Sequence, residues 1–152
     1  MISEALVGHA DQAFDYYSRI NPSKREAISD VHRCEPYVYA QMIAGKDAAT
    51  HGEAKNSWLS GTAAWNFAAI TQYILGIQPT LAGLKIAPVI PTDWPGFQAQ
   101  RVYRGVTYHI DVKRAGSGNA VALTVDGQAV AGNVVPLPAA DAKDVKVEVV
   151  LS

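Results

Sequence analysis

The first quarter of the chain carries apolar residues at helical spacing. They predict a helix over residues 2–20: Ile2, Leu6, Ala10, Ala13, Phe14 and Tyr17. Asn21-Pro22 ends this helix, because a residue before proline avoids the helical region. Ser23 followed by Glu26 is a capping-box pattern and predicts a short second helix from Lys24 to about Val31.

A third helix is predicted over Thr62 to Leu75. Its residues are apolar on almost every side, so we expect it to be buried, with Gly76 as its C-terminal glycine. A stretch rich in Gly, Asp, Thr and His, residues 44–55, precedes it and is expected to be a loop.

After Gln78-Pro79 the apolar period changes from helical to two, which is typical of strands. Two hairpins are predicted, one around Arg104-Gly105 and one around Asp126-Gly127, and residues 145–149 alternate as a last strand. The predicted fold class is therefore α+β, with a few helices followed by an antiparallel β-sandwich.

Composition excludes several classes of protein. The 152 residues are 49% hydrophobic and 18% charged, so the chain can bury a core, and a net charge of -1 gives no electrostatic reason to bind nucleic acid or an anionic membrane. The longest apolar stretch, residues 65–77, is too short to span a bilayer, and the first residues lack the basic region of a secretory signal. The single cysteine, Cys34, cannot form an internal disulfide, which fits a reducing, cytoplasmic setting.

Most residues of chemical interest have a structural interpretation. The four histidines do not show metal-ligand spacing, so no metal is predicted. We expect Cys34 to be a buried thiol, Glu35 to be structural, and Glu53 and Lys55 to be solvated or paired. Beside an Ala-rich helix, Trp58 and Trp65 are expected in a core rather than stacked on a sugar.

Ser60, Gly61 and Thr62 stand where the third helix begins, and they have two interpretations. Ser and Gly are common helix caps, and the residues alone favour that role. The N–H groups at a helix start can also bind an anion, which Gly61 would let approach closely.

Several motifs resemble the C-terminal part of glycoside hydrolase family 94, the cellobiose phosphorylase family. They occur in the family's order and the resemblance covers residues 1 to about 114: EPYVYAQMIAGKD (35–47), GEAKNSWLSGTAAW (52–65), ILGI (74–77), GLKIAP (83–88), Ile90-Pro91 and Asp93-Trp94. The resemblance implies that residues 1–77 are the last helices of an (α/α)6 catalytic barrel and residues 78–152 a C-terminal, jelly-roll-like β-sandwich.

The resemblance also implies a reaction and a site. Family members cleave a β-glucoside disaccharide or oligosaccharide, such as cellobiose, with inorganic phosphate and without a cofactor, giving glucose 1-phosphate with inversion. Ser60 and Gly61 match the phosphate site, where threonine is common in place of this serine, and Gln41 matches a residue beside the reacting sugar. The family's general acid and the other phosphate ligands lie upstream, so these 152 residues are expected to have no catalytic residue and to be inactive alone.

Two other interpretations stay open. The chain could be a stand-alone carbohydrate-binding module that uses Tyr103, Tyr108 and Trp94 on the sandwich. It could instead be an assembly piece, a homodimer whose second copy covers the apolar helices.

Overall fold

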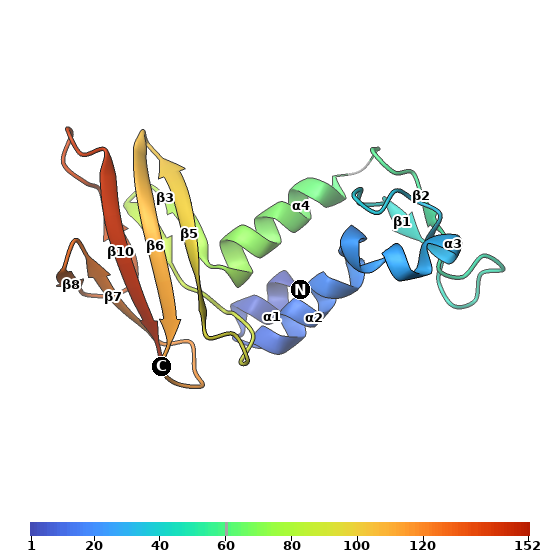
Figure 1. The fold of residues 1–152 in the computed structure, drawn as a ribbon, viewed down its shortest axis with the longest axis horizontal. Helices are drawn as coiled ribbons and strands as arrows, with labels where there is room; N and C mark the ends of the chain where they lie inside the picture. The colour runs from blue at the N-terminus through green and yellow to red at the C-terminus, as the bar shows by residue number, and fades with distance from the viewer. Residues whose placement is uncertain (60) are drawn as a thin grey trace.

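The computed structural model describes residues 1–59 and 61–152. The molecule is elongated, with three parts in a row (Figure 1). Two β-sheets form one end, helices form the middle, and a short helix with a small β-ribbon forms the other end. We call residues 1–76 the helical half and residues 77–151 the strand half.

The first predicted helix is two helices in the structure. α1 spans Ile2–Leu6 and α2 spans Ala10–Ile20. Gly8 lies between them with a φ of 85°, a left-handed conformation that ends a helix. The prediction of one helix over residues 2–20 was therefore wrong at this glycine, although the apolar residues lie where the spacing placed them.

The predicted second helix is replaced by tighter turns. Two 3₁₀ turns, η1 (Pro22–Lys24) and η2 (Glu26–Ile28), lead into the single α-helical turn α3 (Ser29–His32). The predicted capping box is absent from these described residues, because Asn21 caps η1 by accepting from the Ser23 amide at 3.1 Å and the Ser23 hydroxyl at 2.9 Å.

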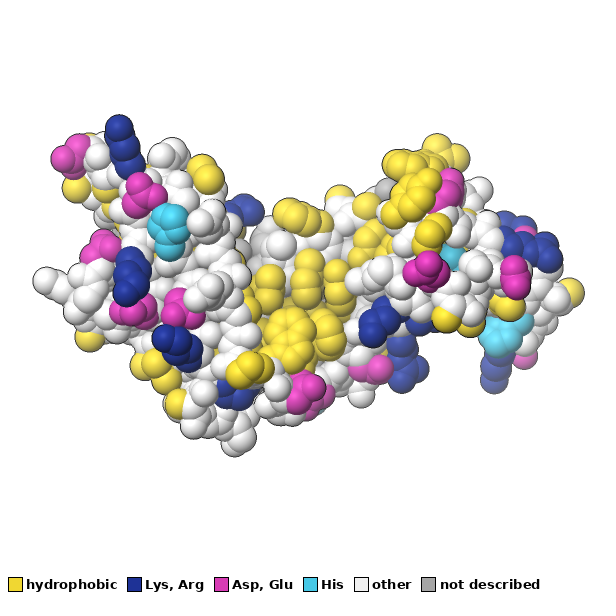
Figure 2. All heavy atoms as spheres, viewed as in Figure 1, with side chains coloured by type: hydrophobic (Ala, Val, Ile, Leu, Met, Phe, Trp, Pro, Cys, Tyr) yellow, Lys and Arg dark blue, Asp and Glu magenta, His cyan; other side chains and the backbone are white. Residues whose placement is uncertain are grey.

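The third predicted helix exists over nearly its expected length, but it is buried on one side only, with Ala69 and Ile74 fully buried. It begins as α4 (Thr62–Ala68) and continues as one π-helical segment, η3 (Ala69–Ile74), and Gly76 follows with a φ of 68°. Trp65 and Phe67 are 69% and 61% exposed. Apolar side chains are therefore uncovered along the middle of the molecule (Figure 2).

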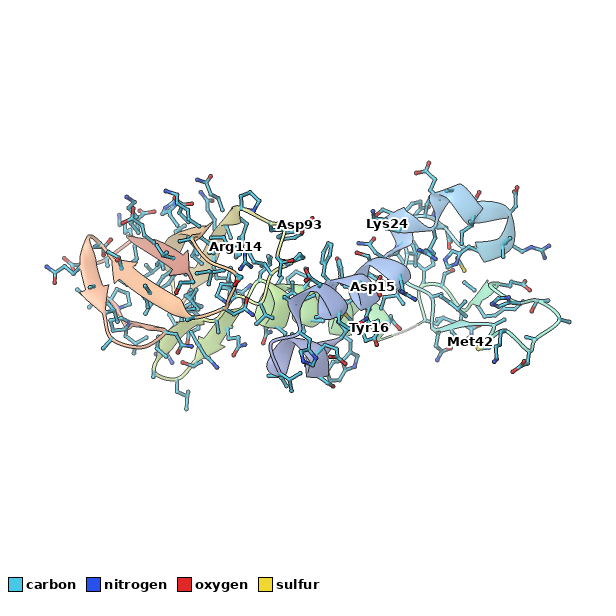
Figure 3. The ribbon with its side chains drawn as sticks, turned by 90° about the horizontal axis from the view of Figure 1, so that it is seen from below. Asp15, Tyr16, Lys24, Met42, Asp93 and Arg114 are labelled. Carbon is cyan, nitrogen blue, oxygen red and sulfur yellow. The ribbon has the colours of Figure 1, made fainter. Side chains whose placement is uncertain are left out.

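A small antiparallel ribbon closes the base of the predicted loop. β1 (Met42–Ile43) pairs with β2 (Ala54–Lys55), so Met42 lies opposite Lys55. Met42 lies at the end of the molecule opposite the strand half (Figure 3).

The strand half contains two sheets. The first sheet has three strands in the order β3-β4-β9: β3 (Ile77–Thr80), β4 (Gly83–Ile86) and β9 (Val134–Pro136). The second has five strands in the order β5-β6-β10-β7-β8: β5 (Gly96–Tyr103), β6 (Val106–Arg114), β7 (Val121–Val125), β8 (Gln128–Val130) and β10 (Asp144–Leu151).

Both predicted hairpins are confirmed. Arg104 and Gly105 join β5 to β6 with φ values of 50° and 80°, and Asp126 and Gly127 join β7 to β8 with 46° and 81°. Two successive positive φ values identify turns of type I′.

The last strand differs from the prediction. β10 lies between β6 and β7, antiparallel to β7 but parallel to β6, so the larger sheet is mixed rather than antiparallel. Alternation along β10 places Val145, Val147, Val149 and Leu151 in the core, and this core also contains Leu84, Ile86 and Val135 of the smaller sheet. The two sheets thus share one hydrophobic core, and the fold is α+β.

Candidate functional site

The β1–β2 ribbon brings the segment before it, residues 35–41, beside the turn that leads into α4. The backbone N–H of Gln41 donates to the backbone carbonyl of Lys55 at 3.2 Å, and Asn56 Nδ2 donates to the side-chain oxygen Oε1 of Gln41 at 2.8 Å. Gln41 therefore uses its side-chain oxygen for an internal bond, and its Nε2 group has two N–H donors to offer.

A pocket of about 230 Å³ lies between this segment and the start of α4. Gln41 and Thr62 both line it, with Ile20, His32, Val38, Tyr39, Ala40, Met42 and Ile43. Residues 41 and 62, which lie far apart in the sequence, therefore meet at one cavity. Gly61 directly precedes Thr62, whereas Ser60 lies outside the described residues.

Gly61 is the N-cap residue of α4. Its φ of -73° and ψ of -1° are accessible to any residue, so its backbone conformation does not require glycine. A Cβ at this position would meet Trp65 Cδ1 at 3.8 Å, an ordinary contact. The space beside the Gly61 backbone is therefore open enough for a small group to approach. The first N–H groups of a helix have no acceptor within their own helix.

The two titratable groups of this pocket are neutral at pH 7. His32 is 4% exposed, and burial, together with the charge of Arg25, lowers its pKa below the ordinary 6.5. Burial and the neighbouring Tyr17 raise the pKa of the Tyr39 hydroxyl. The pocket lining therefore offers neutral hydrogen-bonding groups and an apolar wall, a combination that suits an uncharged polar ligand such as a sugar.

Glu35 is structural within the described residues, as expected. Its Oε1 accepts from Trp58 Nε1 at 3.1 Å, and a backbone N–H and the Trp58 and Ser57 side chains lower the pKa of its carboxyl. Glu53 is paired as predicted, with Lys55 Nζ at 2.7 Å and Arg33 at 3.8 Å.

Other expectations from the sequence were wrong. Trp58 and Trp65 are 70% and 69% exposed rather than in a core, and Cys34 is half-buried rather than buried. Periodicity shows that a residue can be buried but not whether a neighbour covers it.

The aromatic residues proposed for a carbohydrate-binding sandwich do not form an open platform. Tyr108 is fully buried, and the Tyr103 hydroxyl donates to the Thr80 carbonyl at 2.6 Å. Trp94 packs edge-on against Phe14 at 5.0 Å. These three rings belong to the packing of the strand half and of its contact with α2.

A second pocket, of about 390 Å³, lies on the outer face of the larger sheet. It is lined by Gln98, Ala99, Gln100, His109, Ile110, Asp111 and Lys146, and His109 Nε2 lies 2.8 Å from Asp144 Oδ1. This lining has polar groups but no Trp, Tyr or Phe ring on which a sugar could stack.

Within residues 1–59 and 61–152, no group of three or more His, Cys, Asp or Glu side chains is arranged to hold a metal ion. In the same described ranges, none of the helices has the length and apolar character needed to cross a bilayer.

Comparisons with known proteins identify the family. A family model described as the catalytic domain of the glycosyl hydrolase 94 superfamily matches residues 1–76, half of the chain. The chain belongs to this superfamily.

Three relatives are named as phosphorylases. The N,N'-diacetylchitobiose phosphorylases of Vibrio proteolyticus and Vibrio furnissii are 40% and 38% identical over 99% and 85% of this chain. The solabiose phosphorylase of Paenibacillus borealis is 37% identical over 90% of it. The aligned regions make up only 19%, 16% and 18% of these relatives, so the chain spans about a fifth of their length.

Sequence reasoning missed His32, Tyr39 and Asn56. His32 and Tyr39 come to the pocket because the 3₁₀ turns and the segment before β1 fold back on α2, and neither residue has a spacing that signals this. Asn56 did carry a signal, since asparagine is common at positive φ and this residue has a φ of 56°.

Proposed function

We propose that this chain is the C-terminal part of an inverting disaccharide phosphorylase, comprising the closing helices of an (α/α)6 barrel and a jelly-roll-like terminal sandwich. The observation that carries the proposal is the pocket in which Gln41 meets the start of α4, inside the segment matched by the family model. In this proposal Gln41 hydrogen-bonds the sugar, and Ser60 and Gly61 bind inorganic phosphate.

The proposed reaction is the phosphorolysis of a β-linked disaccharide, with cellobiose as the first candidate. A phosphate oxygen bonds to the anomeric carbon from the face opposite the leaving group, and the glycosidic C–O bond breaks. A carboxylic acid gives its proton to the leaving oxygen, so glucose and glucose 1-phosphate form with inversion. N,N'-diacetylchitobiose and solabiose are further candidates because they are named for the relatives.

The chemistry of the pocket indicates which groups this chain would supply to the site and which would come from other polypeptide. Since His32 is neutral and the other described lining residues are uncharged, the charge of phosphate must be balanced by N–H groups at the start of α4 and by cations outside this pocket. In the proposal those cations and the general acid belong to preceding polypeptide, and residues 1–152 are inactive alone. The exposed apolar residues of the helical half support the proposal, because other barrel helices would cover them: Leu6, Val7, Trp65 and Phe67.

The test replaces the aligned region of the Vibrio proteolyticus phosphorylase with this chain and measures glucose 1-phosphate release from the three disaccharides. We expect turnover by the chimera and none by the chain alone. Turnover by the chain alone would contradict the assignment of the acid to other polypeptide, and a folded but inactive chimera would contradict the proposed function.

Gly61→Ala sharpens this test. An alanine fits the backbone, and among the described residues beyond its chain neighbours its Cβ would meet Trp65 alone, so the variant is expected to fold normally. We expect it to raise the KM for phosphate about tenfold by crowding the anion, with the KM for the disaccharide unchanged. An unchanged phosphate KM would remove Gly61 from the proposed site.

A homodimer is the second candidate, favoured by the same exposed apolar side chains. It predicts a dimeric mass in light scattering of the chain alone and a monomer after Trp65→Glu. A monomeric wild-type chain would exclude it.

A further inference from the structure

The turn that leads into α4 contains two residues in the left-handed region. Asn56 has a φ of 56° and Trp58 a φ of 70°. Asparagine adopts this conformation readily, but a bulky aromatic residue does so only where its surroundings impose it. Something must therefore hold Trp58.

Burial within this chain does not hold it, because Trp58 is 70% exposed. Its described contacts come from the segment 35–41. Trp58 Nε1 donates to Glu35 Oε1 at 3.1 Å, and the Tyr37 and Trp58 rings meet edge-on with centroids 6.4 Å apart.

The other left-handed residue is anchored to the same segment. Asn56 Nδ2 donates to Gln41 Oε1 at 2.8 Å. Two side-chain hydrogen bonds therefore join the segment 35–41 to the turn before α4. One lies at each end of the segment, at Glu35 and at Gln41.

We infer that Glu35 is a positioning residue that acts through Trp58 to fix the backbone of residues 56–59, and so the direction from which the chain enters α4 at Gly61. Trp58 lies three residues before Gly61, so a change of its φ redirects the entry to α4. The inference rests on the proposed function for its phosphate readout only. A carboxylate already used as an acceptor, with a pKa below its ordinary value, is poorly suited to be a general acid.

The experiment uses the full 152-residue chain labelled for NMR. Glu35→Ala removes the acceptor, Glu35→Gln keeps a carbonyl oxygen that can accept from the indole, and Trp58→Phe keeps a ring but loses the donor. Glu53→Gln is the matched control, because Glu53 is a second paired carboxylate of the same part but bonds Lys55 rather than the turn.

The first readout is conformational. The Cα and Cβ shifts of Trp58 report its positive φ, and its indole N–H signal reports the bond to Glu35. We expect both to change in Glu35→Ala, to be largely restored in Glu35→Gln and to be unaffected in Glu53→Gln. Signals of the strand half should stay in place throughout, which separates positioning from unfolding.

The second readout is the KM for inorganic phosphate of the chimera with the Vibrio proteolyticus phosphorylase, which supplies the cations that the proposed function places in preceding polypeptide. We expect the same KM for phosphate with the unsubstituted chain and with Glu53→Gln, and a KM about tenfold higher with Glu35→Ala and Trp58→Phe. The double variant Glu35→Ala, Trp58→Phe should have a KM no higher than either single variant, because both remove one interaction.

The outcomes separate the two claims. If the folded chimera is inactive, the proposed function is contradicted, and the Trp58 shifts still decide whether Glu35 fixes the turn. If the chimera turns over but Trp58→Phe leaves its KM for phosphate unchanged, or if Glu35→Ala leaves the Trp58 shifts unchanged, the positioning role is overturned.

Discussion

Asp11, in the first turn of α2, accepts hydrogen bonds from Thr92, which follows the smaller sheet's strand β4 in the chain. The Thr92 amide lies 2.9 Å from Asp11 Oδ1 and the Thr92 hydroxyl 3.0 Å from Oδ2, although the residues are 81 positions apart. With the contact of Phe14 and Trp94, this pair attaches the helical half to the strand half.

Asp11→Ala should weaken that attachment. It removes a charged acceptor at a helix start, where the dipole favours an anion, and we expect a loss of about 1 kcal/mol. Hydrogen exchange of the Thr92 amide measures it directly. Asp15→Ala is the control, because the described partners of Asp15 are exposed residues of its own helix, Arg19 and Gln12, and the change should alter stability by at most about 0.5 kcal/mol. Equal protection of Thr92 in both variants would contradict the role of Asp11.

Arg114 joins the linker after β4 to the loop after β6 (Figure 3). Its guanidinium donates to the carbonyls of Ile90 at 2.9 Å, Trp94 at 3.1 Å and Gly118 at 2.9 Å, with longer bonds to Pro91 and Gly116. An ammonium cannot reproduce this fork, so Arg114→Lys should cost about 2 kcal/mol in urea unfolding. Arg104→Lys, at an exposed hairpin turn, should change the midpoint little.

Gly76 and Gly127 both have positive φ but differ in their surroundings. A Cβ at Gly76 would overlap the Ala87 carbonyl, whereas none of the described atoms lies within 4 Å of a Cβ at Gly127. Gly127→Ala should therefore cost about 1 kcal/mol of backbone strain, and Gly76→Ala at least about 3 kcal/mol. Thermal unfolding of the two variants compares them, and equal losses would show that the overlap is relieved at little cost.

His32 should make stability depend on pH. Its folded-state pKa is below 6.5, so near pH 6 the unfolded chain binds more protons than the folded chain. Above pH 6.5 the imidazole is neutral in both states and does not reduce the free energy of unfolding. Below pH 6.5 the free energy of unfolding falls as the pH decreases, by at most about 1.4 kcal/mol per pH unit. Urea unfolding from pH 8 to pH 5 measures this slope, which His32→Gln should reduce and His51→Gln, at an exposed position, should not.

Tyr108 and Tyr103 should respond oppositely to the loss of a hydroxyl. Among the described residues the buried Tyr108 hydroxyl has no hydrogen-bond partner, whereas that of Tyr103 donates to Thr80. Tyr108→Phe is expected to be neutral or to stabilise by up to about 1 kcal/mol, and Tyr103→Phe to destabilise by about 1 kcal/mol. A clear loss in Tyr108→Phe would show that its hydroxyl is satisfied.

The sequence predicted the elements whose cause is local. Both hairpins were predictable because their turns depend on the two residues at the tip, Arg104-Gly105 and Asp126-Gly127, which adopt positive φ. The partner of β10 was not, because alternation shows which residues face the core but not which strand lies alongside. The exposure of Trp65 also depends on neighbours that a period does not identify. The cap by Asn21 is local, since its partner Ser23 is two residues on, and the capping-box interpretation of Ser23 missed it.

The family motif directed attention to Gln41 and to the start of α4. Gln41 and Thr62 line one pocket, but sugar binding by Gln41 and phosphate binding by Ser60 and Gly61 stay predictions. His32 lies in that pocket because of the irregular turns that precede it, which no period predicts. The bond between Glu35 and Trp58 was not predictable either, because their separation in the sequence does not indicate a contact.

The position of β10 also constrains how the protein is made. β10 follows the other four strands of the larger sheet in the chain but lies at the sheet's centre, so a ribosome must release residues 144–151 before that sheet can close. Until then the two finished hairpins present bare inner edges to the cell. The nascent chain is therefore most prone to aggregate in the interval before β10 emerges, and slow translation of the codons for residues 144–151 would lengthen that interval.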